Sequence, residues 1–302
     1  MINYTIIIPT KDIPSLLRRC LNSIPNRYDV QIIVIDDNSD PDIVDFDNYP
    51  GSDDPRIEIY YNKENKGAGY ARNIGLKHAQ GKWVLFADSD DFFTEEISLI
   101  LDEYIDTDFD VIYFKATSVD SVTLEPSIRA IGFNKYVDLY LNKEIDELEI
   151  GLNYCVPWGK IIRRSIIDKY ALKYSETKAS NDVYFATQLS LVSKNIFADN
   201  RSLYCITFRH GSLTTTPSVS LLYDRLNERL KSNQLLIQTG HGDRIGSVAY
   251  IIYCIYKIAG LKEVVKAVHI VKKSNTSLFT GWRNWLKTIA FLKKNRISGL
   301  NY

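Results

Sequence analysis

The sequence lacks the features that mark secreted, disulfide-stabilised or membrane-spanning proteins. Its four cysteines are widely separated and form no Cys-x-x-Cys pair, which disfavours a zinc site and suits a reducing compartment. No basic region followed by an apolar run opens the chain, so we expect no signal peptide. The longest apolar stretch, residues 248–258, is interrupted by Lys257 and is shorter than the roughly 20 residues that span a bilayer. These absences predict a cytoplasmic protein.

The chain also lacks any net charge, but this average hides a division along its length. Residues 1–217 carry 23 Lys and Arg against 33 Asp and Glu, whereas residues 218–302 carry 14 against 4. Hydrophobic residues make up 45% of the 302 residues and charged residues 25%, which is typical of a globular protein. The change of charge near Pro217 predicts a main domain, 1–217, followed by a basic helical region, 218–302.

Short apolar runs alternate with helical patterns through the first part of the chain. The expected strands cover residues 5–8, 32–35, 57–61, 83–87, 111–114 and 202–209. The expected helices cover residues 16–24, 69–79, 99–105 and 180–192, and the pattern is helical from residue 220. Residues 116–155 show less regularity. This alternation predicts an α/β fold with a mainly parallel sheet that helices cover on both faces.

An acidic turn, Asp88-Ser89-Asp90-Asp91, directly follows the expected strand 83–87. Ligands of open α/β sheets bind at the carboxyl ends of strands, and crowded carboxylates raise each other's pKa unless a cation neutralises them. Carboxylate oxygens suit Mg²⁺ or Mn²⁺, which often bridge protein carboxylates to a diphosphate. The alternative is a helix N-cap, which suits Asp91 ahead of the helix near residues 95–104 but does not explain Asp88 and Asp90 together. We therefore predict metal ligands at Asp88 and Asp90.

A glycine-rich segment lies between the third and fourth expected strands. Gly67 and Gly69 allow a ligand to approach the backbone closely, and Arg72 suits a bidentate contact with phosphate. Taken alone, the two glycines favour an ordinary turn. Beside Arg72 and the acidic turns, a phosphate-binding role is favoured.

The order of these motifs resembles glycosyltransferase family 2, whose members are nucleotide-sugar transferases of the GT-A fold. The resemblance is dense over residues 3–115, where it rests on Ile7-Ile8-Pro9-Thr10, Val34-Ile35-Asp36-Asp37-Asn38-Ser39, Asn65-Lys66-Gly67 with Ala71-Arg72-Asn73, and Gly81 to Asp91. It is thinner at 157–164, 181–185 and 209–214. The GT-A fold is Rossmann-like, so the resemblance implies an α/β catalytic domain, 1–217, with a helical C-terminal extension.

The family's binding residues carry over by position. The implied nucleotide-sugar site consists of Pro9, Thr10, Asp37, Gly67, Arg72, Asp88 and Ser89. Within it, Asp37 is expected to accept from the imide N–H of a uracil base, Asp88 to face the ribose or the metal, and Asp90 to bind the Mn²⁺ or Mg²⁺ that bridges the diphosphate.

The same resemblance implies a catalytic base at Asp182, with Asn181 standing where the family usually has an acidic residue. His210 follows 28 positions later and is a candidate third metal ligand, with an ordinary loop residue as the alternative. Trp158 and Lys160 are expected to line the donor or acceptor pocket, with a place in the core as a nearly equal alternative for Trp158.

These residues together imply an inverting transfer of a sugar from a UDP-linked donor to a hydroxyl acceptor. The resemblance favours a glycan or lipid-linked acceptor in bacterial surface polysaccharide or glycolipid synthesis. A nucleotidyltransferase is an alternative, but it would need a basic, glycine-rich loop after the first strand, and residues 9–14 contain one Lys and no Gly. A non-catalytic subunit of a membrane-bound assembly is another, and it would not require Asp88, Asp90 and Asp182.

The end of the chain carries an amphipathic pattern over residues 278–296. Its apolar stripe recurs at spacings of three and four, at Leu278, Trp282, Trp285, Leu286, Ile289 and Leu292, with basic residues opposite. Such a helix either packs its stripe on the main domain or lies at an anionic membrane. The excess of Lys and Arg after residue 217 favours peripheral contact with the inner face of the cell membrane. Nucleic acid is disfavoured because no recognition motif accompanies the charge.

Overall fold

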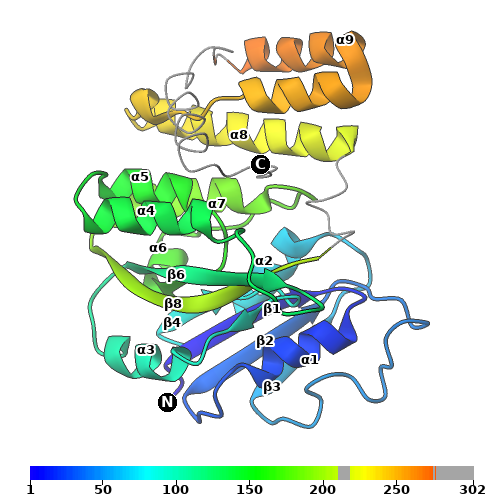
Figure 1. Ribbon diagram of the computed structural model, residues 1–302, viewed down its shortest axis with the longest axis vertical. Helices are drawn as coiled ribbons and strands as arrows, with labels where there is room; N and C mark the ends of the chain where they lie inside the picture. The colour runs from blue at the N-terminus through cyan, green and yellow to red at the C-terminus, as the bar shows by residue number, and fades with distance from the viewer. Residues whose placement is uncertain (210–217, 275, 277–302) are drawn as a thin grey trace.

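A computed structural model describes residues 1–209, 218–274 and 276, and a single sheet forms its centre (Figure 1). The described residues contribute eight strands: β1 (Tyr4–Thr10), β2 (Val30–Asp36), β3 (Ile57–Tyr61), β4 (Trp83–Phe86), β5 (Phe92–Phe93), β6 (Val111–Asp120), β7 (Lys160–Arg163) and β8 (Ile196–Phe208). Their order across the sheet is β3-β2-β1-β4-β7-β6-β8-β5.

The strand directions confirm the predicted α/β fold. β1 pairs in parallel with β2 and β4, β2 pairs in parallel with β3, and β6 pairs in parallel with β8. β7 runs antiparallel to both of its neighbours, β4 and β6, and β5 runs antiparallel to β8. The sheet is therefore mixed, with a fully parallel half formed by the first four strands in space.

Helices cover both faces of the sheet. They are α1 (Pro14–Asn22), α2 (Ala68–His78), α3 (Ile97–Tyr104), α4 (Ile131–Leu141), α5 (Glu147–Asn153), α6 (Arg164–Tyr170), α7 (Asn181–Val192), α8 (Val219–Gln238) and α9 (Ala249–Lys273), with a short 3₁₀ turn, η1 (Gly242–Arg244). Figure 1 shows α4, α5 and α7 on one side of the sheet with α8 and α9 beyond them, and α1 and α3 on the other side. The segment 116–155 is more regular than expected, since it holds the end of β6 together with α4 and α5.

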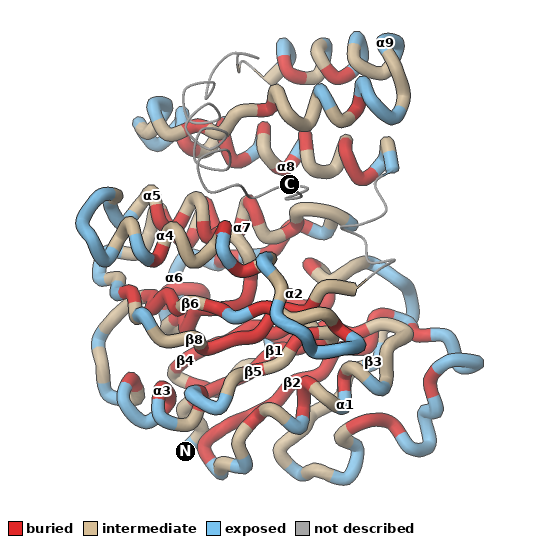
Figure 2. The backbone as a smooth tube through the Cα atoms, viewed as in Figure 1, coloured by how far each residue is buried: buried red, intermediate tan, exposed pale blue. Residues whose placement is uncertain are grey.

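The burial of the strands explains their composition. Every residue of β1 and β2 is buried, so these strands are mostly apolar instead of alternating (Figure 2). Near their first residues, the Thr5 hydroxyl of β1 donates to the Gln31 side-chain oxygen of β2 at 2.7 Å. The central sheet is thus a rigid support for the loops at its carboxyl edge.

The C-terminal helices have an apolar cluster of their own. It joins α8 to α9 through Leu222, Leu226, Leu230, Val248, Ile255, Ala267 and Val271. α8 also contacts the main body, where the Thr187 hydroxyl on α7 donates to the Ser232 hydroxyl at 3.1 Å. Among the described helices, none is long and apolar enough to cross a membrane. Residues 278–296, with the predicted amphipathic helix, lie outside the described residues.

Candidate active site

The parallel strands bring the predicted site residues to one edge of the sheet. Thr10 ends β1 and pairs in register with Asp36 at the end of β2. The Asp37 N–H donates to the Thr10 carbonyl at 2.9 Å, and the Ala87 N–H donates to the Ile7 carbonyl at 3.1 Å. The turns that carry Asp37 and Asp88 therefore leave the same edge of the sheet, one on either side of β1.

The Asp37 carboxylate holds the glycine-rich segment in place. Its oxygens accept hydrogen bonds from the Asn62 side-chain amide at 3.0 Å, the Lys66 N–H at 3.1 Å and the Gly67 N–H at 2.7 Å. Gly67 has φ +89 and precedes α2, so the residue type is set by the left-handed backbone at this point. A carboxylate offers about four acceptor positions, so Asp37 keeps room for one more donor.

Arg72 joins two parts of the site that are distant in sequence. Its Nη1 donates to the Asn181 side-chain oxygen at 2.9 Å, and its Nη2 donates to an Asp88 carboxylate oxygen at 2.5 Å. The guanidinium is buried, lies 5.2 Å from the centre of the Tyr174 ring, and its Nε has no hydrogen-bond partner among the described residues. Arg72 thus ties the acidic turn after β4 to the start of α7. The phosphate contact expected for Arg72 stays a prediction.

Asp182 lies in the first turn of α7, near the Arg72 guanidinium. Burial raises the pKa of its carboxyl group, while the Arg72 guanidinium lowers it; the Asp88 charge raises it further, and Lys160 lowers it. A carboxylate with a raised pKa is a stronger base than an exposed one, which suits proton removal near neutral pH. The predicted base therefore lies beside the predicted donor residues.

The three acidic residues after β4 have different surroundings. The Asp88 side chain is partly exposed and paired with Arg72. Burial and the neighbouring Asp88 charge raise the pKa of Asp90, whose carboxylate lies 3.7 Å from the Arg209 guanidinium. Asp91 is buried and accepts from the Thr207 N–H at 2.6 Å, which anchors the turn to β8. The N-cap interpretation of Asp91 is wrong, because α3 begins after Glu96.

Asp88 and Asp90 would supply two of the oxygen ligands that a hard divalent cation needs. Both offer carboxylate oxygens, and a cation would relieve the crowding that raises the pKa of Asp90. Among the described residues no group of three His, Cys, Asp or Glu side chains gathers to hold a metal. An ion here would need oxygens from substrate or water to complete its coordination. His210, the candidate third ligand, lies outside the described residues.

Trp158 and Lys160 are both buried, and their expected place in the donor or acceptor pocket stays a prediction. Trp158 stacks on Tyr204, with ring centres 5.7 Å apart and an angle of 13° between the planes. The Lys160 ammonium donates to the Tyr154 carbonyl at 2.6 Å, and burial lowers its pKa to about 8. The Lys160 charge in turn lowers the pKa of Asp182. Pro9, Thr10 and Ser89 are likewise buried at the strand ends.

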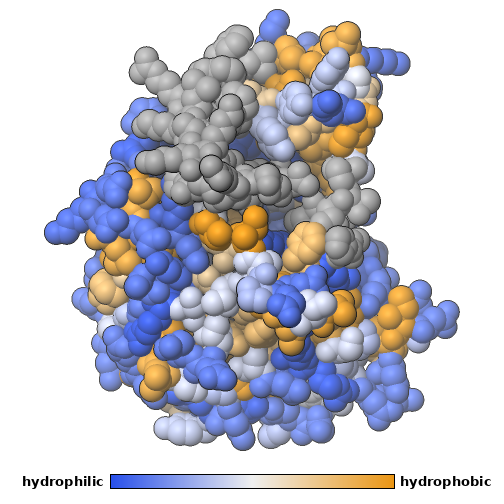
Figure 3. Space-filling model, viewed as in Figure 1, coloured by the Kyte–Doolittle hydropathy of each residue, from blue (hydrophilic) through white to orange (hydrophobic). Residues whose placement is uncertain are grey.

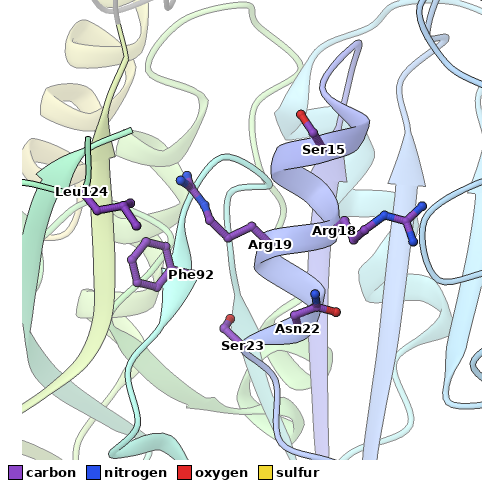
Figure 4. Close-up of a pocket in the computed structure, with 7 residues that line it drawn as sticks. All are labelled: Ser15, Arg18, Arg19, Asn22, Ser23, Phe92 and Leu124. Atoms are coloured by element: carbon purple, nitrogen blue, oxygen red, sulfur yellow. The ribbon is translucent and has the colours of Figure 1, made fainter. Parts of the chain in front are cut away.

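Two supporting residues were not identified from the sequence. Tyr174 lies against Arg72, and Arg19 of α1 donates to the carbonyl oxygens of Asp90 at 2.6 Å and Ser121 at 2.9 Å. Arg19 extends over the Phe92 ring, 5.2 Å from its centre (Figure 4). Both residues line a hollow with a volume of about 600 Å³. No motif distinguishes either residue, because their contacts are made between segments far apart in the chain.

Comparison with known proteins shows the family to which the chain belongs. The model of glycosyl transferase family 2 matches residues 5–171. Glycosyltransferase GlyA of Streptococcus pneumoniae is 26% identical over 238 residues, which are 75% of this chain and 34% of that protein. Poly(ribitol-phosphate) beta-N-acetylglucosaminyltransferase TarS of Staphylococcus aureus is 24% identical over 73% of this chain and 38% of its own length. The chain therefore spans about a third of the length of these relatives.

A solved structure shares the fold. S. aureus TarS 1–349 in complex with UDP-GlcNAc superposes with a TM-score of 0.63 and 22% identity, over 85% of this chain and 73% of that one. The fold is therefore of the GT-A class. More specifically, the chain belongs to glycosyl transferase family 2.

Proposed function

We propose that the protein is an inverting glycosyltransferase that moves a sugar from a UDP-linked donor to a hydroxyl acceptor. The observation that carries the proposal is the pair of hydrogen bonds from the Arg72 guanidinium to Asn181 and Asp88. These bonds hold Asp88 and the start of α7 together at the carboxyl edge of the sheet. This arrangement puts a candidate base within the same small region as the candidate donor residues. Membership of the family supports the reaction class.

Each of the candidate site residues has a separate role in the proposed reaction. The acceptor hydroxyl gives its proton to Asp182 as its oxygen attacks the anomeric carbon, and the bond from that carbon to the donor diphosphate breaks. Direct displacement inverts the anomeric centre. Asp37 has an acceptor position left for a base N–H. Asp88 and Asp90 would hold Mn²⁺ or Mg²⁺, which when bound stabilises negative charge on a leaving diphosphate.

The relatives suggest where the acceptor belongs. TarS is named for transfer of N-acetylglucosamine to poly(ribitol phosphate), and a relative from Bacillus spizizenii, 26% identical over 64% of this chain, is named a poly(ribitol-phosphate) beta-glucosyltransferase. We infer a cell-surface polysaccharide or a lipid-linked precursor as the acceptor of this protein.

Donor binding is tested by thermal shift with UDP and UDP-sugars, each with and without Mn²⁺. A ligand at 100 times its dissociation constant stabilises the folded state by about 2.7 kcal/mol, so a clear rise in Tm is expected with UDP and Mn²⁺ together. Asp90→Ala should abolish the Mn²⁺-dependent part, whereas Asp53→Ala, at an exposed position, should keep it. Equal UDP affinity of Asp90→Ala and wild type in Mn²⁺ would contradict the metal assignment.

The role of Asp182 is tested by Asp182→Asn in a product assay. Turnover should fall by about 10²–10⁴-fold because the proton acceptor is lost, while the UDP-dependent rise in Tm persists. Asp53→Asn serves as the matched control and should leave turnover unchanged. Turnover within a few-fold of wild type would show that another group is the base.

A further inference from the structure

Helix α9 bends at Gly260, and the surface at this bend is unusual. Gly260 has φ +75 and interrupts the helix, so that α9 folds back on itself at the far end of the molecule from the sheet (Figure 1). One apolar cluster contains Ile255 from the first half and Ala267 and Val271 from the second, which shows that the two halves pack together. The bend between them is thus a defined tip.

Large apolar side chains at this tip face solvent. Leu261 is 71% exposed and Val265 69%, and they lie one turn apart on the second half. Tyr256 and Ile258, at 48% and 44%, precede the bend. Figure 3 shows apolar side chains over this outer end of the helical region. Exposed apolar side chains grouped in this way mark an interaction site more often than scattered single ones.

The same tip is basic. Lys257 and Lys262 flank the bend on either side, and both are exposed. Five Lys and one Glu occur between Ala249 and Lys273. The one acid, Glu263, is already paired with Lys266 at 2.6 Å and accepts from the Tyr223 hydroxyl at 2.9 Å. The tip therefore presents apolar side chains flanked by the exposed Lys257 and Lys262.

The charge of the tip distinguishes among the partners that could bind it. Residues 277–302 contain five Lys and Arg and no Asp or Glu, so they repel the tip instead of complementing it. A second copy of the tip is repelled for the same reason. Nucleic acid would match the charge but would leave Leu261 and Val265 unburied. An anionic bilayer satisfies both features, because acyl chains bury the apolar side chains and headgroups pair with the lysines.

We propose that the α9 tip, residues 256–265, is a docking surface for an anionic lipid bilayer. The proposal goes beyond sugar transfer and does not depend on it. It also differs from the membrane contact predicted for residues 278–296, because it rests on exposed side chains of a described helix.

The test is co-sedimentation of the full chain with vesicles of phosphatidylglycerol and phosphatidylcholine, compared with phosphatidylcholine alone. Wild type should bind the anionic vesicles only. The double variant Leu261→Glu/Val265→Glu should lose affinity by about tenfold or more, since two charges replace the inserted side chains. The matched control is Tyr28→Glu/Val122→Glu, at positions 90% and 89% exposed on the main body, and it should bind like wild type.

A second variant checks the electrostatic part and protects against a folding defect. Lys257→Ser/Lys262→Ser should weaken binding by about fivefold for each Lys, and raised salt should have the same effect on wild type. Circular dichroism and sedimentation velocity are measured for every variant. Unchanged vesicle binding by both double variants overturns the proposal. So does an absence of wild-type binding, or a wild-type dimer that the Leu261→Glu/Val265→Glu change dissociates, which would make a second copy the occupant.

Discussion

At the scale of single residues, Arg72 and Asn181 determine the electrostatics of the site. Asn181 is a neutral acceptor where a carboxylate would compete with Asp88 for the guanidinium. The Arg72 charge consequently remains available to offset the effect of burial on the pKa of Asp182. This gives a physical meaning to the departure of Asn181 from the family's usual acidic residue.

Asn181→Asp is expected to raise the pKa of Asp182 further, because a second negative charge then adjoins it and shares Arg72. Activity that needs ionised Asp182 is lost as pH falls through this pKa, so the acid limb of kcat/KM should move to higher pH. The measurement is the pH profile of kcat/KM. Asn26→Asp, an exposed position with the same change of charge, should leave the profile in place. An unshifted Asn181→Asp profile would separate Asn181 from the base.

At the scale of elements, the site depends on how closely α2 approaches the segment before α7. Gly69 lies in the first turn of α2, and a methyl group there would overlap the Ser175 carbonyl oxygen and lie 2.9 Å from the Asn181 Cβ. A glycine is needed here because of this close approach and not because of its backbone angles. The same contact keeps Arg72, one turn further along α2, within reach of Asn181.

Gly69→Ala should therefore displace α2 from α7 and cost about 1–3 kcal/mol of the free energy of unfolding, as overpacking does. It should also weaken UDP binding because Arg72 moves with the helix. Denaturant unfolding and the UDP thermal shift measure the two effects. Gly242→Ala, where an added methyl meets only Ile237 at 3.8 Å, is the matched control and should behave like wild type. A stable Gly69→Ala protein would show that α2 tolerates the shift.

At the scale of the whole molecule, α8 connects the helical C-terminal region to the helix that carries Asp182. Lys231 donates to the Ser175 hydroxyl at 3.1 Å, and its ammonium lies 3.8 Å from the centre of the Tyr184 ring. Glu228 is buried nearby, burial raises its pKa, and its Oε2 has no hydrogen-bond partner among the described residues. The interface thus contains a carboxyl group whose ionisation costs stability.

Glu228→Gln is expected to raise the Tm at pH 7 by about 2 °C, or roughly 1 kcal/mol. Because the folded pKa is raised, wild type loses stability as pH rises from the ordinary Glu pKa, about 4.3, through the raised value. The gain should therefore vanish near pH 4. Glu263→Gln is the opposite control: its partners Lys266 and Tyr223 lower the pKa of Glu263, so neutralising it should not raise the Tm. Scanning calorimetry at both pH values distinguishes these outcomes.

The sequence predicted the sheet and the site to different degrees. The strands of the parallel half are apolar runs followed by turn residues, and such local patterns predicted β1 to β4 correctly. The sequence did not predict β7, a four-residue strand, or α4 and α5 within 116–155. β7 is stabilised by pairing with β4 on one side and β6 on the other, and no local pattern in residues 160–163 indicates these pairings.

The order of motifs was enough to determine the family, the fold and the edge of the sheet at which polar residues gather. Parallel strands place their carboxyl ends at one edge of the sheet whatever connects them, so Asp37 and Asp88 were expected at the same edge. Only the tertiary structure decided what each residue contacts. Arg72 and Asn181 are 109 positions apart, and Asp91 and Thr207 are 116 apart. Pairings over such separations depend on packing between elements, which residue type and spacing along the chain do not specify.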